Sequence, residues 1–188
     1  MYELVEAARL RGTIPITKWT AVFTVLGIGV CLLSWRWLAR RTGWRRWPTL
    51  GALLSLAAAL ALTVSPRGGR SRNRRTLAEC LPADWADLGR SAGKVGDSVE
   101  SLLNVGLLVP LGFTLVLACR RVAWPAALML LLPAAIELAQ TSINGRQCTP
   151  ADWMANALGG LVGVGAGLLV HRWWQARERT PLPAAANP

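Results

Sequence analysis

Long apolar segments alternate with short polar and basic segments along most of this chain. An α-helix rises about 1.5 Å per residue, so an apolar segment of about 20 residues crosses a hydrocarbon core about 30 Å thick. Segments of this length predict five transmembrane helices, at residues 19–38, 47–65, 101–119, 122–141 and 153–174. We therefore expect an all-α fold, a polytopic membrane helical bundle that forms one domain over residues 1–188.

The composition supports a membrane protein, and the tryptophans support the predicted helix ends. The chain is 53% hydrophobic, has a mean hydropathy of +0.35 and contains 10 Trp. Indole rings prefer the headgroup level of a membrane, and every Trp except Trp85 lies within a few residues of a predicted helix end. The first apolar segment is full length and lacks a small-x-small cleavage site after it, so we expect it to remain in the mature protein. The Pro- and Ala-rich residues 175–188 predict a disordered tail.

The distribution of Arg and Lys gives the expected orientation. Five spans divide the 21 basic residues almost equally between the two sides of the membrane. Short loops beside helix ends weigh most in the positive-inside rule, and the connections at residues 35–47 and 120–121 are short and strongly basic. We therefore expect the N-terminus outside and the C-terminus in the cytoplasm of a bacterial plasma membrane.

A net charge of +11 bears on the expected partners. In a soluble protein this charge would indicate nucleic acid, but arginines that flank apolar segments are attracted to anionic lipid headgroups. We expect membrane lipids as partners and no nucleic acid. The sequence does not determine the oligomeric state.

The four cysteines fall into two classes. Cys31 and Cys119 lie within or at the end of predicted spans, where cysteine commonly serves as a small apolar residue. Cys80 and Cys148 lie in two different loops on the same predicted side of the membrane. If that side is oxidising, the two can form a disulfide that ties the long loop to the last one. The alternative is two unpaired thiols.

Polar residues gather at the ends of three predicted helices on that same side. Glu137 and Gln140 are three residues apart and Asp152 and Asn156 are four apart, so each pair shares one face of a helix. The full candidate cluster contains Asp97, Asn104, Glu137, Gln140, Arg146, Asp152 and Asn156. If these helix ends meet, the cluster forms one pocket at the outer headgroup level.

Small residues continue the polar stripe along the last predicted span. Gly159, Gly163 and Gly167 recur every four residues, a small-xxx-small pattern that lets another helix approach closely. We expect these glycines, together with Gly112, to form helix contacts.

Three segments follow one another in order: NVGLLVPLGF at residues 104–113, IELAQ at residues 136–140 and GRQCTPADWMANALGGLVG at residues 145–163. In residue type and spacing they resemble the VanZ-like family of small bacterial membrane proteins, with the closest similarity over residues 97–170. The residues that match the family pattern are Asn104, Pro110, Leu111, Gly112, Glu137, Gln140, Arg146, Asp152, Asn156 and Gly159. Two features depart from it: Leu108 stands where such proteins often have Phe, and the pair of Cys80 and Cys148 is not part of the general pattern.

The resemblance implies a membrane bundle and a limited expectation of function. The name-giving member of the family is associated with resistance to the glycopeptide antibiotic teicoplanin. The resemblance leads us to expect a non-enzymatic cell-envelope protein linked to teicoplanin-type resistance, whose extracytoplasmic polar pocket takes a glycopeptide or a lipid-linked cell-wall precursor. The alternative is a membrane enzyme or transporter that acts on lipid-linked envelope precursors.

The polar cluster allows two roles, which are compatible. It can form a hydrogen-bonded and ion-paired cap that locks three helices together. It can also form a pocket for an extracellular or lipid-headgroup ligand, in which Arg146 recognises phosphate or carboxylate.

Sequence motifs give little support for catalysis, so we expect no enzyme, no metal and no cofactor. The single histidine, His171, is expected at the cytoplasmic end of the last span, away from the carboxylates. The sequence contains no H-E-x-x-H and no G-x-S-x-G motif. A mechanism in which Glu137 and Asp152 act as acid and base is the remaining enzymatic hypothesis.

Overall fold

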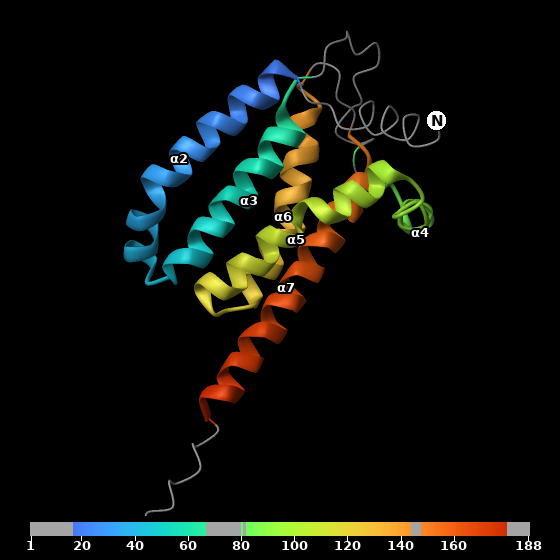
Figure 1. Ribbon diagram of the computed structural model, residues 1–188. Helices are drawn as coiled ribbons and strands as arrows, with labels where there is room; N and C mark the ends of the chain where they lie inside the picture. Colours follow the sequence, from blue (N-terminus) through green and yellow to red (C-terminus); the bar gives the residue numbers. More distant parts are fainter. Residues whose placement is uncertain (1–16, 67–79, 81, 144–147, 180–188) are drawn as a thin grey trace, which may run out of the picture.

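The computed structural model describes residues 17–66, 80, 82–143 and 148–179, whose arrangement is drawn in Figure 1. The helices are α2 (Lys18–Thr42), α3 (Arg46–Val64), α4 (Trp85–Gly93), α5 (Val99–Cys119), α6 (Ala123–Gln140) and α7 (Pro150–Arg179). No strand occurs within the described residues. All of these helices except α4 are long and apolar enough to cross a membrane. The structure therefore confirms the predicted all-α bundle with five candidate membrane spans.

The turn between α2 and α3 has a clear local cause. The helix α2 ends at Gly43, whose φ of 70° is the left-handed conformation that glycine adopts without strain. The next residue, Trp44, stacks on Trp124 of α6 with ring centroids 5.4 Å apart. The backbone N–H of Arg45 donates to the Ala118 carbonyl near the end of α5, at 3.1 Å. The turn is thereby attached to the helices that follow.

Two helical segments lie where the sequence predicted a loop and a disordered tail. The short helix α4 lies in the predicted long loop, and Asp84 caps it by accepting the Asp87 backbone N–H at 2.7 Å. The helix α7 continues to Arg179, past the predicted end of the last span. It does so because the first helix-breaking residue after His171 is Pro181. Residues 180–188 of the predicted tail lie outside the described residues.

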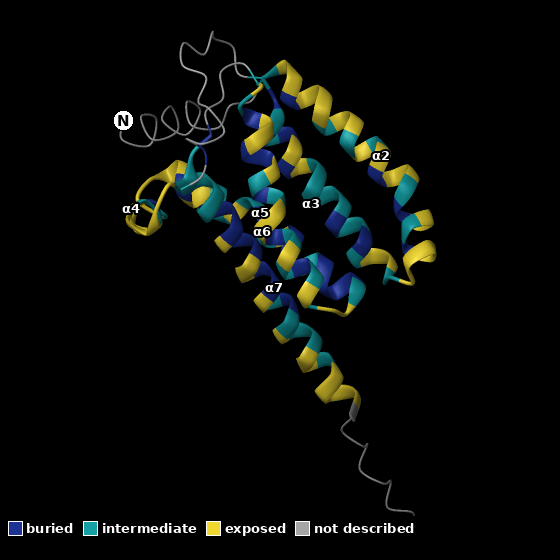
Figure 2. Cartoon of the chain, turned by 180° about the vertical axis from the view of Figure 1, so that it is seen from behind, coloured by how far each residue is buried: buried dark blue, intermediate teal, exposed yellow. Residues whose placement is uncertain are grey.

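The core forms around α5, which packs on α3 and on α7, while α2 packs on α3. Leu108 and Val116 of α5, Met129 of α6 and Ala59 of α3 have no exposed surface. The helix α2 is different, because Figure 2 shows it exposed along much of its length, and 86% of Leu33 is accessible. In a membrane such an apolar surface faces lipid, whereas a larger share of α5 is buried against other helices.

Glycines allow α5 and α7 to pack backbone against backbone. A Cβ atom placed on Gly159 or on Gly163 of α7 would collide with the carbonyl oxygen of Val105 or Val109 of α5. One turn further along, a Cβ on Gly167 would lie 2.8 Å from the Phe113 carbonyl oxygen. Gly112 of α5 faces the Gly160 carbonyl in the same way. This close contact fixes the start of α7 beside the start of α5, where the polar residues lie.

Candidate functional site

The start of α7 is built by the sequence Thr-Pro-Ala-Asp at residues 149–152. The Asp152 backbone N–H donates to the Thr149 hydroxyl oxygen at 3.1 Å, and the Trp153 N–H donates to the Thr149 carbonyl at 3.2 Å. Thr149 is therefore the N-cap, and Pro150 occupies the first helical position, where a missing N–H costs nothing. The Thr149 hydroxyl donates in return to the Asp152 carboxylate, at 2.8 Å.

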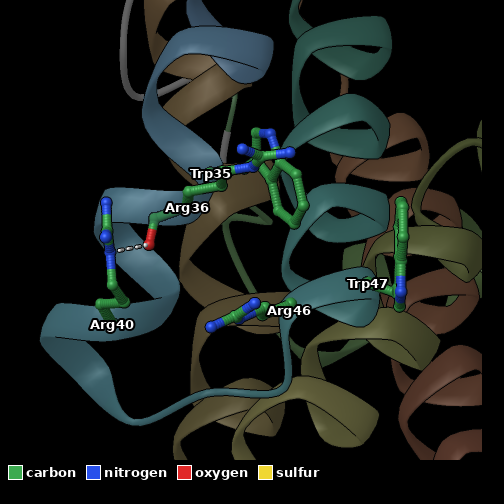
Figure 3. Close-up of a pocket in the computed structure, with 5 residues that line it drawn as sticks. All are labelled: Trp35, Arg36, Arg40, Arg46 and Trp47. Carbon is green, nitrogen blue, oxygen red and sulfur yellow. Dashed lines mark hydrogen bonds between the residues drawn. The ribbon is translucent and has the colours of Figure 1, made fainter.

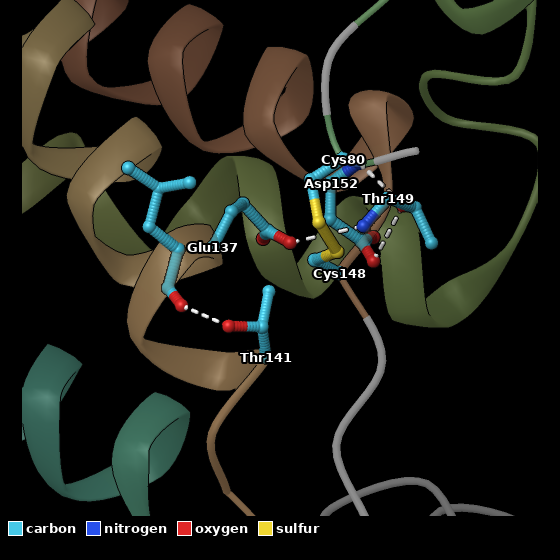
Figure 4. The surroundings of a disulfide bond; sticks show 7 residues. Cys80, Glu137, Thr141, Cys148, Thr149 and Asp152 are labelled. Carbon is cyan, nitrogen blue, oxygen red and sulfur yellow. Dashed lines mark hydrogen bonds between the residues drawn. A yellow bond between two sulfur atoms is a disulfide. The ribbon is translucent and has the colours of Figure 1, made fainter. Parts of the chain in front are cut away.

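Two other helices contribute polar side chains to this helix start, as Figure 4 shows for α6. From α6, the Glu137 carboxylate accepts the backbone N–H of Thr149 at 3.0 Å. From α5, the Asn104 side-chain amide donates to the second Asp152 carboxylate oxygen at 2.7 Å. Both carboxylates lie at the N-terminus of α7, where the helix dipole stabilises negative charge. Thr149 and Asp152 together thus link residues from α5, α6 and α7.

Gln140 connects the same region to α3. Its amide N–H donates to the Thr63 carbonyl at 3.1 Å. That carbonyl lies in the last turn of α3, where carbonyl groups have no partner within the helix. Glu137 and Gln140 are both buried, at 3% and 7% exposed. We call the set of Asn104, Glu137, Gln140, Thr149, Asp152 and Asn156 the polar junction.

Asn156 differs from the rest of the polar junction. It lies one turn beyond Asp152 on α7 and is 2% exposed. Its Oδ1 atom is buried and has no hydrogen-bond partner among the described residues. A buried acceptor without a partner costs about 1 to 3 kcal/mol, so such an atom calls for an explanation.

A disulfide joins the polar junction to the long loop. Cys148 directly precedes Thr149, and its sulfur is bonded to that of Cys80, with the Cα atoms 5.3 Å apart. Both cysteines are buried, at 1% exposed. In Figure 4 the bond lies beside Asp152 and across from Glu137. It closes a loop with a sequence separation of 68 residues, so the start of α7 is held covalently as well as by hydrogen bonds.

The family model described as VanZ/LLP1 matches residues 73–171, more than half of the chain. The chain belongs to the VanZ/LLP1 family. No curated protein and no solved structure matches it. The VanZ/LLP1 match runs from before α4 into α7 and includes every residue of the polar junction, while α2 and α3 lie outside it.

The remaining predicted site residues of this VanZ/LLP1 protein lie elsewhere. Asp97 is exposed in the turn before α5, and no hydrogen bond within the described residues joins its side chain to the polar junction. Arg146 lies outside the described residues. His171 is 19 positions beyond Asp152 on the same helix, which is about 28 Å along its axis. Within the described part of the chain, no group of three or more His, Cys, Asp or Glu is placed to hold a metal ion.

The structure adds Thr149 and Thr63 to the site of this VanZ/LLP1 protein. Thr149 carries a sequence signal, because Thr-Pro-x-Asp combines an N-cap, a first-turn proline and an acidic third position. Thr63 carries none, since it contributes a backbone carbonyl that any residue could supply. The Trp153 indole N–H also pairs with a backbone carbonyl, that of Leu130 on α6, at 3.2 Å.

Proposed function

We propose that this VanZ/LLP1 membrane protein binds a cell-envelope ligand at its polar junction and thereby lowers susceptibility to teicoplanin-type glycopeptides, without catalysing a reaction. The ligand is either the glycopeptide itself or a lipid-linked cell-wall precursor. Both are rich in peptide N–H and sugar O–H groups, which are hydrogen-bond donors.

The observation that carries this proposal is the unpartnered Oδ1 atom of Asn156. It is an acceptor, it is buried, and it lies one helical turn from the Asp152 carboxylate. A ligand N–H or O–H that reached it would replace an unsatisfied polar atom with a hydrogen bond, and sites built this way discriminate strongly for a ligand that supplies the missing partner.

The pairing of the two carboxylates supports a binding role over an acid–base role. Asp152 accepts hydrogen bonds from Asn104 and from the Thr149 hydroxyl, and Glu137 accepts the Thr149 N–H. These bonds hold the ends of α5, α6 and α7 together. A general acid or base needs instead a free path to the proton of a substrate.

The disulfide supports an extracytoplasmic position for the polar junction. Disulfides persist in oxidising compartments and are rare in the cytosol. Cys148 is adjacent to Thr149, so the bond and the junction share one side of the membrane. This agrees with the orientation that the positive-inside rule favours.

The test is glycopeptide susceptibility in a bacterial host that expresses the full chain at matched levels. We expect the wild type to raise the minimal inhibitory concentration of teicoplanin, and Asn156→Leu to abolish that effect because the variant loses the buried acceptor and keeps a similar volume. His171→Ala, at the far end of the same helix, is the matched control and should retain the effect. Equal susceptibility with and without the wild type would overturn the proposal.

A second measurement separates binding from catalysis. Purified protein is incubated with teicoplanin, and separately with a lipid-linked cell-wall precursor, and both binding and chemical conversion are followed. We expect one of the two to bind the wild type and not Asn156→Leu, with the compound recovered unchanged. Conversion of the precursor that is lost in Glu137→Gln would replace the binding role with an enzymatic one.

A further inference from the structure

A cavity lies at the opposite end of the bundle, between the last turns of α2 and the first turn of α3 (Figure 3). Its volume is about 320 Å³. It is lined by Trp35, Arg36, Arg40, Arg46 and Trp47, which we call the arginine pocket. A cavity of this size is at the lower end of the range for small-molecule sites, and it accommodates a headgroup rather than a whole lipid.

Three arginines, two from α2 and one from α3, line this cavity. Arg36 and Arg40 are four residues apart on α2, so they share one face, and the Arg40 Nε–H donates to the Arg36 carbonyl at 3.3 Å. Arg36 also lies over the Trp35 ring, with its guanidinium carbon 5.1 Å from the ring centroid. Arg46 reaches from the start of α3 toward the α2 turn, as Figure 3 shows. Among the described residues, no hydrogen bond or ion pair involves the terminal nitrogens of Arg40, which can therefore bind an anion.

No counterion for the arginine pocket lies within the part of the chain that the structure describes. The sequence contains no acidic residue between Glu6 and Glu79, so neither α2 nor α3 supplies a carboxylate. Within the described residues, no ion pair involves any of the three arginines. The N-terminus of α3 adds the positive end of its dipole, because Arg45 caps it with no side-chain hydrogen bond. Like charges around one cavity repel one another, and an anion bound between them reduces that repulsion.

The walls of the arginine pocket suit a group that is half polar and half apolar. Trp35 is buried and stacks on the exposed Trp47, with centroids 5.5 Å apart. Indole rings at this position mark the headgroup level of a membrane. The rings therefore offer a surface for carbon atoms, and the arginines offer N–H groups for oxygen atoms.

We propose that the arginine pocket is a specific site for a phosphate group, that of an anionic phospholipid headgroup at the membrane surface. Planar guanidinium groups match the geometry of phosphate oxygens and bind them through paired N–H groups. The glycerol carbons of the lipid lie against the Trp35 and Trp47 rings. The site differs from the general attraction of basic loops to anionic lipid, because it has a defined volume and specific lining residues. It does not depend on the polar junction.

The test compares two double variants with the same net charge. The first, Arg40→Gln with Arg46→Gln, removes two lining arginines. The control, Arg41→Gln with Arg121→Gln, removes two exposed arginines that do not line the cavity. The full chain is purified in detergent, titrated with short-chain phosphatidylglycerol and, separately, with inorganic phosphate, and bound ligand is counted by native mass spectrometry.

We expect phosphatidylglycerol to bind the wild type and the control equally and the first variant about a hundredfold more weakly, since each charge-assisted hydrogen bond changes a dissociation constant about tenfold. Binding of inorganic phosphate without binding of phosphatidylglycerol would keep the phosphate site and reassign its source to a free phosphate compound. Equal weakening in both double variants would overturn the proposal, because it would reduce the effect to net charge. Absence of binding of either ligand to the wild type would overturn it as well.

A third double variant separates loss of binding from misfolding. Arg40→Lys with Arg46→Lys keeps both charges and removes the planar N–H groups, so we expect the fold to be retained and phosphate affinity to fall by about tenfold. Circular dichroism and gel filtration check the fold of each variant. An unchanged affinity in the lysine pair would contradict recognition by guanidinium geometry.

Discussion

The polar junction and the arginine pocket lie at opposite ends of the bundle and handle charge in opposite ways. In the junction, the carboxylates of Glu137 and Asp152 accept hydrogen bonds from residues of other elements. In the pocket, Arg40 and Arg46 are exposed and have no anionic partner within the described residues. Hydrogen-bonded polar groups hold a structure together, whereas a cluster of unpaired cations attracts an anion from outside the protein. The comparison assigns a helix-joining role to the two carboxylates of the junction, beside the proposed ligand acceptor Asn156, and a ligand-dependent role to the arginines of the pocket.

The helices pack more tightly around the polar junction than around the arginine pocket. Near the polar junction, glycines bring the backbones of α5 and α7 into contact. Near the arginine pocket, α2 packs closely on α3 and on no other described helix. The outer face of α2 is exposed (Figure 2). Substitutions should therefore affect stability strongly in the first region and weakly in the second.

The largest effect is expected at Gly159. In Gly159→Ala the new methyl group meets the Val105 carbonyl, so α5 and α7 must separate, and we expect a loss of about 3 kcal/mol in the free energy of unfolding. Gly29→Ala on α2 is the matched control, because nothing lies within 4 Å of its Cβ position. Thermal unfolding in detergent measures both. Equal melting temperatures for the two variants would contradict the prediction that α5 and α7 pack more tightly than α2 and α3.

Removal of the disulfide should have the next largest effect. In Cys80→Ser with Cys148→Ser, the chain loses a link with a sequence separation of 68 residues, and we expect a cost of about 2 kcal/mol. Cys119→Ser, at the opposite end of α5, is the control and should cost less than about 0.5 kcal/mol. A reductant should lower the melting temperature of the wild type and leave that of the double variant unchanged. A melting temperature insensitive to reductant in both proteins would contradict this prediction.

A smaller effect is expected from the hydrogen bond between α5 and α7. A double-mutant cycle with Asn104→Ala and Asp152→Ala should give a coupling energy of about 1.5 kcal/mol, because one partner of the 2.7 Å bond is charged. The free energies of unfolding of the two single variants and the double variant supply the cycle. Additive effects would mean that the bond contributes nothing to the junction.

The smallest effect on stability is expected in the arginine pocket. Arg40→Gln with Arg46→Gln should change the free energy of unfolding by less than about 0.5 kcal/mol in detergent without lipid, because both side chains are exposed. The same protein should lose its added stability on titration with phosphatidylglycerol, since a ligand stabilises only the state that binds it. A large loss in lipid-free detergent would show that these arginines hold the fold.

The hydropathy of the sequence predicted the membrane helices because their apolar segments match the thickness of a bilayer. The helix α4 was not predicted, since it is short and its capping residue Asp84 lies inside a polar loop. The continuation of α7 to Arg179 was not predicted either, because residues 175–179 are polar, and polarity marks the end of a span without marking the end of a helix.

The sequence placed Glu137, Gln140, Asp152 and Asn156 on helix faces, because helical spacing determines which residues share a face. It did not give their partners, which depend on how helices distant in sequence meet. The carbonyl of Thr63 is an example, because nothing in its side chain indicates that Gln140 donates to it. The arginine pocket was not predicted for the same reason: the sequence showed a basic connection, but only the fold brings Arg46 beside the α2 turn.

The proposed function depends on one property of the molecule, the position of the polar junction and its disulfide on the outer side of the membrane. The direct test is labelling of intact cells with a maleimide that does not cross membranes, before and after a reductant that also stays outside. Cys80 and Cys148 should be labelled only after reduction, and Cys119, at the other end of α5, only after the membrane is permeabilised. Labelling of Cys119 in intact cells, or of the disulfide cysteines only after permeabilisation, would contradict the proposed function.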